Sequence, residues 1–361
     1  ATFTVDASIN SISIGKGANS VAGNTVLGES ALDAAVTGGL NTAIGNTTLT
    51  ANTSGQWNTV VGALAMDANT TGSNNTAVGL SALGSNTTAS NNVAIGLNAL
   101  SANTTGTKNT GIGAYALDAN TDATANTGLG YESLTSNTTG ASNTAVGRGS
   151  LANNTTASNN TAVGDESLIL NTTGARNTAI GYLTLDANTT ASYNTAVGGV
   201  ALTANTTGTG NVALGDAALY ANTTGNHNTG IGKDALYTST TGHRNTAVGY
   251  FSLKNATTAD NNTAVGHESL LTNTTGYSNV AVGNYTQRNG TTGYSNNAFG
   301  YQALYSVTTG NRNQAFGGGC LDANTTGSYN TAVGHEALTE NTTANDNAAF
   351  GFQALKLNTT G

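Results

Sequence analysis

The ionisable residues of this sequence that could support acid–base or metal chemistry are few, and several of them recur at two neighbouring places in a repeating pattern. Paired carboxylates can act as general acid and base, and His beside Glu can contribute ligands to a metal ion. The candidate pairs are Asp165-Glu166, His267-Glu268, His335-Glu336, and Asp216 with Asp234. Whether any of them act together depends on where the pattern places them in space.

The spacing of these residues argues against a catalytic or metal site. Lys233 occupies the same place in the pattern as Asp216, one repeat later, so the two predict a surface ion pair that contributes little. The two His-Glu pairs are four repeats apart, roughly 19 Å at the spacing of stacked strands, which is too far to share a metal. Gly317-Gly318-Gly319 lacks the strand–helix context of a phosphate-binding loop. We therefore predict no enzymatic activity, no metal site and no cofactor.

The pattern that carries these residues is a repeat of 17 residues. Asn recurs at that spacing twenty times from Asn24 to Asn347, and a glycine always follows four residues later, from Gly28 to Gly351. With the Asn as position 0, position 3 is always apolar, and position 8 is Leu except at Met66 and Gln287. Position 2 is nearly always Ala or Gly, position 7 is always small, and positions 11 to 14 read Asn-Thr-Thr-Gly or a near variant. Such strict spacing indicates units that stack on one another.

The composition of the repeat favours strands over helices, because β-branched Thr and Val and regular Gly oppose a helix. We predict an all-β fold: a parallel β-solenoid, or β-roll, with two short strands per coil. Residues 1–23 are expected to form a lead-in with a short first coil, and residues 24–361 the twenty repeats. Stacked Asn residues should form amide ladders, and Gly at position 4 should serve a bend that needs a positive φ or close backbone approach.

The alternation of side chains along a strand predicts which positions face the core. If the apolar residues at positions 3 and 8 point inward, Thr at position 1 also points inward and the small residues at positions 2 and 7 point outward. Two apolar side chains per coil bury little surface for the number of residues ordered. Strips of small residues would let another chain approach closely, which predicts a parallel homotrimer. The alternative is that small residues simply suit a thin coil.

Charge and composition narrow the classes of partner. The net charge is −8 and the ten Lys and Arg are dispersed, which argues against a nucleic-acid partner. Only 8% of residues are charged and proline is absent, but the apolar residues recur at fixed positions, which argues against disorder. Cys320 is the only cysteine, and no stretch is apolar enough for membrane insertion. The chain starts without Met and has no visible signal peptide, so we expect a processed product or a fragment.

The aromatic residues are the best candidates for recognition. All 13 tyrosines lie at variable positions of the repeat, where we expect them exposed on bends and able to stack on sugars or anchor a partner. The alternative is that they are scattered aromatics that cover neighbouring coils. The densest group, which we predict as the recognition surface, is Tyr250, Phe251, Tyr285, Tyr294, Tyr301 and Tyr305. Gln287, which interrupts the Leu column, lies beside this group.

Two sets of residues carry a resemblance to known families. Asn10-Ser11-Ile12-Ser13-Ile14-Gly15 and the many Asn-Thr-Ala-Val-Gly units resemble the head repeats of trimeric autotransporter adhesins, which implies left-handed parallel β-rolls of three associated chains. The longer unit, Asn-Thr-Ala-Val-Gly-x-x-Ala-Leu-x-x-Asn-Thr-Thr-Gly, resembles the shaft repeats of bacteriophage tail fibres, many of which carry a self-cleaving chaperone of the endosialidase type. The resemblance covers residues 10–361. The repeat is longer than the adhesin unit, and these residues include neither a chaperone nor a membrane anchor.

The resemblance implies a structural fibre. Our leading hypothesis is the trimeric shaft of a phage tail fibre or receptor-binding spike, extracellular on a virion, that acts as a rigid spacer for host attachment. Its partners would be its own copies and a host or cell-surface glycan or protein. The alternative is a bacterial trimeric surface adhesin or extracellular filament. A third hypothesis, an ice-binding solenoid, is disfavoured because Thr at position 1 is expected to face inward and no Thr-x-Thr pair recurs.

Overall fold

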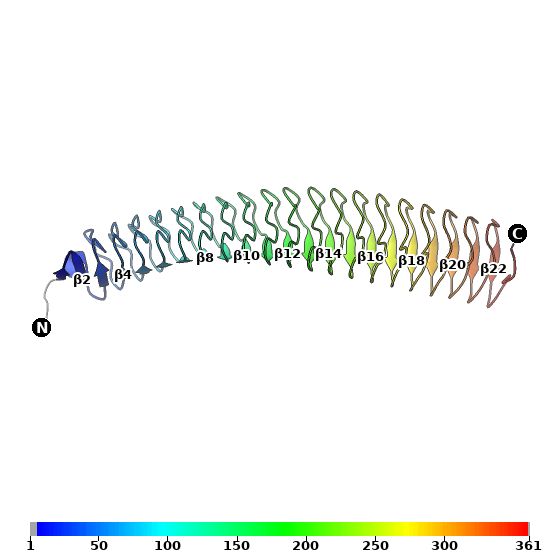
Figure 1. Cartoon of the computed structure of the whole chain (residues 1–361), viewed down its shortest axis with the longest axis horizontal. Helices are drawn as coiled ribbons and strands as arrows, with labels where there is room; N and C mark the ends of the chain where they lie inside the picture. Colours follow the sequence, from blue (N-terminus) through cyan, green and yellow to red (C-terminus); the bar gives the residue numbers. More distant parts are fainter. Residues whose placement is uncertain (1–5, 360–361) are drawn as a thin grey trace. The chain divides into compact units, whose positions relative to one another are not determined.

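The computed structural model describes residues 6–359, which fall into two compact units that divide between Asn177 and Thr178, and each unit is a succession of stacked coils (Figure 1). The first unit opens with an antiparallel hairpin of β1 (Ala7–Ile9) and β2 (Ile12–Gly15), followed by a 3-10 turn at Ala18–Ser20. Strand β2 also pairs antiparallel with β3. The lead-in therefore covers the edge of the first parallel coil with a hairpin instead of forming a short coil of its own.

From β3 onward, the neighbouring strands of the first unit pair in parallel, each shifted by one repeat, as in Thr144 opposite Thr161. Its parallel strands are β3 (Thr25–Gly28), β4 (Thr42–Ile44), β5 (Thr59–Val61), β6 (Thr76–Val78), β7 (Val93–Ile95), β8 (Thr110–Ile112), β9 (Thr127–Leu129), β10 (Thr144–Val146) and β11 (Thr161–Val163). The same register is found in every neighbouring pair of strands from β3–β4 to β10–β11.

The second unit repeats the same arrangement, as in Thr246 opposite Thr263. Its strands are β12 (Thr178–Ile180), β13 (Thr195–Val197), β14 (Val212–Leu214), β15 (Thr229–Ile231), β16 (Thr246–Val248), β17 (Thr263–Val265), β18 (Val280–Val282), β19 (Asn297–Phe299), β20 (Gln314–Phe316), β21 (Thr331–Val333) and β22 (Ala348–Phe350). Each unit is thus a parallel β-solenoid, which confirms the predicted fold class. None of the described residues forms a helix long and apolar enough to span a lipid bilayer.

The prediction of two strands per coil is wrong, because each coil holds a single short strand at positions 1 to 3. The second expected strand is interrupted by left-handed backbone at positions 6 and 8, as at Glu166 (φ 53°) and Leu168 (φ 55°). Residues in this conformation cannot continue an extended strand. Hydrogen bonds between coils still form there: the amide of Leu151 donates to the carbonyl of Ser167 at 3.1 Å. The coils are therefore joined by backbone hydrogen bonds outside the strands as well.

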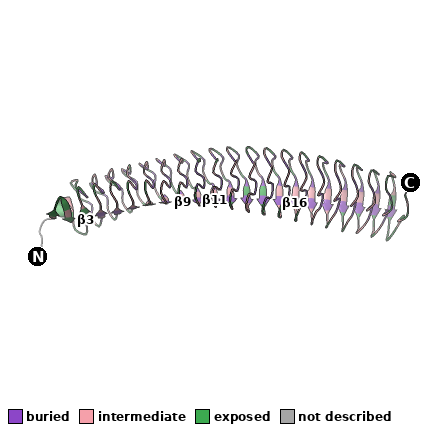
Figure 2. Ribbon diagram, viewed as in Figure 1, coloured by how far each residue is buried: buried purple, intermediate pink, exposed green. Residues whose placement is uncertain are grey.

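The predicted orientation of the strand is also wrong, whereas the inward Leu column is confirmed. Ala145 at position 2 is fully buried, while Thr144 and Val146 on either side of it are only half-buried. Position 7 is buried too, next to Leu151 at position 8. Figure 2 shows buried and half-buried segments together along many of the strands. The core therefore consists of Leu and small residues, and the apolar column at position 3 faces outward beside Thr.

The packing of position 2 against Leu explains this orientation. A Cβ added at Gly111 would lie 3.3 Å from Cγ of Leu100, which is at position 8 of the preceding coil. That separation is already tight for a methyl group, so Ala or Gly fits the site far better than a large side chain. The face of the strand that carries the small residue at position 2 therefore packs inside the coil. The face that carries the larger residues at positions 1 and 3 lies on the surface.

The predicted Asn ladder is confirmed, and a second one accompanies it. At position 0, the Asn143 amide donates to Oδ1 of Asn126 at 2.9 Å, and Nδ2 of Asn143 donates to the carbonyl of Ala157 at 2.8 Å. At position 11, Nδ2 of Asn154 donates to Oδ1 of Asn137 at 2.8 Å and to Ala157 at 3.0 Å. All these Asn side chains are buried. Their hydrogen bonds satisfy polar groups that would otherwise be costly inside the coil.

Cys320 occupies the buried position 7, where it replaces the Ser found in other coils. Its thiol donates to the carbonyl of Gly317 at 2.9 Å, as the hydroxyl of Ser150 does to Gly147 at 3.1 Å. Burial raises the pKa of the Cys320 thiol to about 12 from 9.0. The thiolate, which is the reactive form, is therefore strongly disfavoured in the folded protein.

We expect Cys320 to resist a disulfide reagent at pH 8, because its thiolate fraction in the folded chain is on the order of a thousandfold below that of an ordinary thiol. Labelling should become rapid once denaturant is added. The raised pKa also means that this residue's contribution to stability is intact below about pH 9 and is lost as the pH rises toward about 12. Equal labelling rates for folded and unfolded protein would contradict the burial.

Candidate functional site

The predicted recognition residues lie in the second unit, and the structure brings five of the six to one side of it. Tyr250, Phe251, Tyr285 and Tyr301 lie at positions 5 and 6, just after the strand, and Tyr305 lies at position 9 of the same coil as Tyr301. The exception, Tyr294, lies at position 15, elsewhere on the coil. The common side is therefore defined by positions 5, 6 and 9.

The rings at positions 5 and 6 form a run from coil to coil. Tyr250 stacks on Phe251 with centroids 3.8 Å apart and on His267 at 5.4 Å. His267 meets Tyr285 edge-on at 5.1 Å, and Tyr285 meets Tyr301 edge-on at 6.2 Å. These are the stacked and T-shaped arrangements that aromatic rings prefer. His267, which the sequence suggested only as a metal-ligand candidate, is a member of this run.

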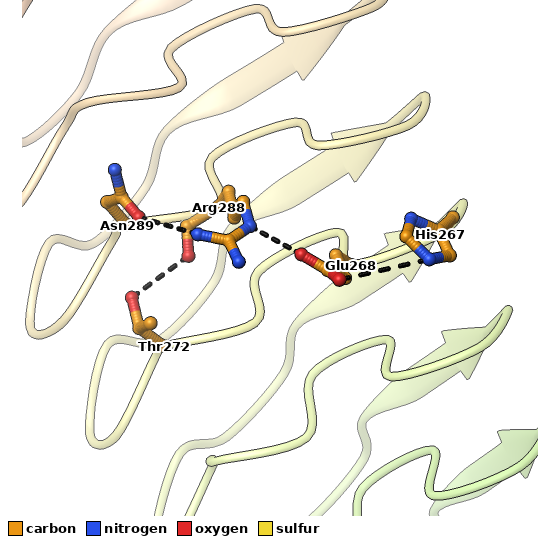
Figure 3. A network of polar contacts seen from close by, with 5 residues as sticks. All are labelled: His267, Glu268, Thr272, Arg288 and Asn289. Atoms are coloured by element: carbon orange, nitrogen blue, oxygen red, sulfur yellow. Dashed lines mark hydrogen bonds and ion pairs between the residues drawn. The ribbon is translucent and has the colours of Figure 1, made fainter.

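A polar network continues the run toward position 9 (Figure 3). Nε of Arg288 contacts Oε2 of Glu268 at 2.5 Å, and Oε1 of Glu268 lies 3.8 Å from Nε2 of His267. The hydroxyl of Thr272 donates to the carbonyl of Arg288 at 2.9 Å. The hydrogen bond to Glu268 is the main cause that raises the pKa of Arg288. The side chains of Arg288 and Glu268 neutralise each other and leave no free cation here.

Two adjoining cavities lie along this side, and we call them together the aromatic groove. The first, about 340 Å³, is lined by Glu268, Tyr285, Arg288, Gln302 and Tyr305. The second, about 320 Å³, shares Gln302 and is further lined by Tyr301, Gly318, Gly319, Asp322 and His335, together with Glu336 and Thr339. Sequence reasoning missed Gln302 and the role of the glycines. Gly318 and Gly319 stand where neighbouring coils carry Tyr301 and Gln302, and the missing side chains help to open the second cavity.

Asp322 is the least satisfied group of the groove. Its Oδ1 atom is buried without a hydrogen-bond partner. Burial first, and then the neighbouring charge of Glu340, raise the pKa of the Asp322 carboxyl. An unpaired buried acceptor costs free energy until a donor reaches it. The carboxyl group of Asp322 also lines the second cavity, where it is the acidic acceptor nearest to Gly318 and Gly319 in the repeat.

A smaller aromatic cluster surrounds Tyr294. Its ring stacks on Tyr277 with centroids 4.9 Å apart and an interplanar angle of 1°. The guanidinium of Arg312 lies 5.4 Å from the centroid of Tyr294 and 5.3 Å from that of Tyr329. The hydrogen bond to Tyr329 is the main cause that raises the pKa of Arg312. Because these rings stack on one another and on Arg312, this cluster has the geometry of aromatics that cover neighbouring coils.

The other candidate residues of the sequence occupy ion pairs or the core. Nζ of Lys233 lies 3.7 Å from Oδ2 of Asp216, both side chains being more than half exposed, which confirms the predicted surface pair. Arg148 pairs with Asp165 at 2.9 Å and Glu166 at 2.8 Å. Within residues 6–359, no group of three His, Cys, Asp or Glu side chains is close enough to hold a metal ion.

Gln287 belongs to the core and not to the groove. Its side chain is 1% exposed, and Nε2 donates to the carbonyl of Val280 at 3.0 Å. The amide therefore replaces a Leu side chain in the column while its donor remains satisfied. The coil that carries Gln287 still contributes Tyr285 and Arg288 to the lining of the groove.

The second notable surface is the outward side of the strands, which we call the strand face: the side chains at positions 1 and 3 of β3–β11 and, in the other unit, of β12–β22. No charged residue occupies either position in any repeat. Large apolar side chains are exposed there, such as Leu129 at 44% and Leu214 at 46%. Phe299 and Phe316 stack on this face with centroids 5.0 Å apart. Thr at position 1 lies on the same face, which corrects the prediction that it points inward.

No protein-family model matches this chain, and no curated protein sequence matches it. Its function has to be inferred from its surfaces. The strand face and the aromatic groove are the two that combine exposure with a defined chemistry.

Proposed function

We propose that the protein is the shaft of a homotrimeric fibre, such as a phage tail fibre or receptor-binding spike, which acts as a spacer for attachment to a host surface. The observation that carries the proposal is the strand face. In each unit it presents an apolar side chain at position 3 of every coil and no charge. Exposed apolar patches of this extent mark surfaces that contact another protein.

The strand face takes the place of the interface expected from the sequence. The small residues at positions 2 and 7 cannot contact another chain, because they are buried within their own coil. The outward apolar column can do so instead. Three parallel copies related by a threefold axis would each contact the next, and the ring closes without an open end. In parallel chains, identical residues lie at the same level, so apolar side chains meet apolar side chains throughout.

The proposal predicts a particle with about three times the chain mass of 35.7 kDa in sedimentation or light scattering. Replacing Val146→Asp and Val163→Asp together places charges on the strand face of neighbouring coils. We expect this variant to run as a single chain at micromolar concentration, because a buried unpaired charge strongly opposes assembly. The matched control is Ser142→Asp with Asn159→Asp, at the exposed position 16, where Asp346 occurs naturally. The control should keep the mass of three chains.

A folded wild-type sample with the mass of one chain would overturn the trimer. If the trimer stands, the same shaft would also serve in a bacterial surface adhesin or extracellular filament. Antibodies against this chain separate the two settings, because they would label virion fibres in the first and the cell surface in the second.

An ice-binding solenoid is a second candidate, because the Thr residues at position 1 lie on the outward strand face. Every strand from β3 to β11 except β7 begins with an outward Thr two residues before an outward apolar side chain. Such a pair repeats at the strand spacing of about 4.8 Å and carries no charge. The strand face cannot bind ice and be buried in a trimer at the same time. If the chain is monomeric, thermal hysteresis in the wild type that is lost on Val146→Asp would support this candidate.

A further inference from the structure

We infer that the aromatic groove is a binding site for an uncharged glycan. The inference adds a ligand class to the host-attachment role proposed above, and rests on that role only for the source of the glycan. The groove itself lies within one chain and within the second unit. It can therefore be tested whether or not the chains assemble.

The shape of the groove suits an extended ligand. The cavities of about 340 and 320 Å³ are joined at Gln302, which lines both of them. Along position 5, successive coils carry Tyr301, Gly318 and His335, so a gap without a side chain separates two rings. A linear oligosaccharide can place one sugar in each cavity, whereas a single small molecule would fill only one. The arrangement thus favours a chain of sugars.

The groups in the groove match the two faces of a pyranose ring. A sugar presents an apolar C–H face, which packs on the electron-rich face of an aromatic ring, and an edge of hydroxyl groups. Tyr301 offers its ring with 58% of the residue exposed. The amide of Gln302 carries a donor and an acceptor that can engage neighbouring hydroxyls, and the carboxyl group of Asp322 lines the second cavity as a further acceptor. A small number of polar groups placed among aromatic side chains is typical of a ligand-binding site.

The charges of the groove favour a neutral glycan over an acidic one. Arg288 is held by Glu268 at 2.5 Å, and Lys356 contacts Glu336 at the edge of the second cavity. Among the other lining residues, Asp322 carries a carboxyl group and His335 an imidazole. A sialylated or sulfated sugar would face that carboxyl group, and neither cavity is lined by a Lys or Arg that lacks a carboxylate partner.

The test uses the full chain and a printed panel of neutral oligosaccharides built on glucose, mannose, galactose and N-acetylglucosamine, with sialylated and sulfated oligosaccharides beside them. We expect binding to one or more neutral members. The strongest neutral oligosaccharide is then titrated against variants by calorimetry. Gly319→Gln should lower its affinity by about tenfold or more, because the added side chain fills the second cavity. Tyr301→Ala should have a similar effect through the loss of the ring.

Each variant has a matched control at the same position of the repeat. Gly149→Gln mirrors Gly319→Gln, since the two glycines have φ of 62° and 64° and similar open space. Gln occurs at this position in Gln302 and Gln353, so both variants should fold. Tyr182→Ala mirrors Tyr301→Ala, with 57% and 58% exposure. Neither control should change the affinity beyond about twofold.

Several results would overturn the inference: no binding to any neutral oligosaccharide, binding confined to sialylated or sulfated ones, or equal losses in the variants and their controls. Thermal unfolding and particle mass of each variant exclude loss by misfolding, and Gly319→Gln decides the matter if Tyr301→Ala does not fold. The outcome is separate from that of the fibre proposal. A trimer that binds no glycan would contradict only the inference about the groove. A monomer that binds the glycan would contradict only the proposal of a trimeric fibre.

Discussion

Gly147→Ala is expected to destabilise the coils around it by about 3–5 kcal/mol. Gly147 stands at position 4 with φ of 133°, a backbone conformation that residues with a Cβ rarely adopt. The added methyl carbon would also lie 2.3 Å from the carbonyl oxygen of Gly164 in the next coil. That oxygen belongs to the backbone and cannot turn away. The neighbouring coils would have to separate and lose hydrogen bonds.

Hydrogen–deuterium exchange of β10 and β11 measures this effect locally, which suits a repeat protein that need not unfold in one step. The control is Gly149→Ala, two residues along the same coil. Its φ is 62°, a conformation that Leu, Glu and Gln adopt at equivalent places, and its nearest neighbour would be 3.6 Å away. We expect a change within about 1 kcal/mol there. Comparable protection in the two variants would show that close stacking at position 4 is not needed.

Asn143→Ala is expected to cost about 2–4 kcal/mol, because it interrupts a buried ladder. Oδ1 of Asn143 accepts a hydrogen bond from the amide of Asn160 at 2.9 Å, and that amide would be left buried without a partner. The bond from Nδ2 to the carbonyl of Ala157 is lost as well, although Asn154 still donates to the same carbonyl. The methyl group also leaves a small cavity in the coil.

The matched control is Asn153→Ala, on the surface of the same coil at position 10. The side chain of Asn153 is exposed, so its removal should change stability by no more than about 0.5 kcal/mol. Urea unfolding, followed by circular dichroism together with hydrogen exchange, compares the pair. If Asn143→Ala unfolds at the same urea concentration as Asn153→Ala, the ladder does not stabilise the coil in the way inferred here.

The features that depend only on the period of the sequence could be predicted. An Asn that returns without insertion has to stack on its own copies, and a glycine fixed four residues later points to a position where a Cβ is excluded. The pairing of Asp216 with Lys233 followed from the same count. These inferences need the spacing of residues but not the path of the backbone between them.

The side of the strand that faces the core could not be predicted. Alternation shows that Thr144 and Val146 share one face and that Ala145 takes the other, but not which face is inside. The usual preference for burying the larger apolar residue failed because Leu151, at φ 52°, turns its side chain toward the strand and fills the interior. A left-handed conformation is uncommon for Leu, and nothing in its identity announces it.

The residues that line the aromatic groove could be predicted only in part. Nearness in sequence grouped Tyr294 with the others, whereas its position in the repeat places it beside Tyr277 instead. Comparing residues by their position in the repeat, and not by their nearness in the sequence, would have separated Tyr294 from the group and added His267 to it. The cavity at Gly318 and Gly319 depends on side chains that are missing, and a search for chemically active residues does not find such a feature.

The Asn ladders have a consequence for how such a protein changes length. Each Asn at position 0 is held to its counterpart 17 residues away, as Asn143 is to Asn126, so an insertion of any other size would break the ladder on one side of it. Duplication or deletion of a whole repeat preserves every remaining contact and moves the ends by about 4.8 Å. Recombination between near-identical repeats could therefore lengthen or shorten the molecule in equal steps, and its reach could evolve without any change in the residues that hold it together.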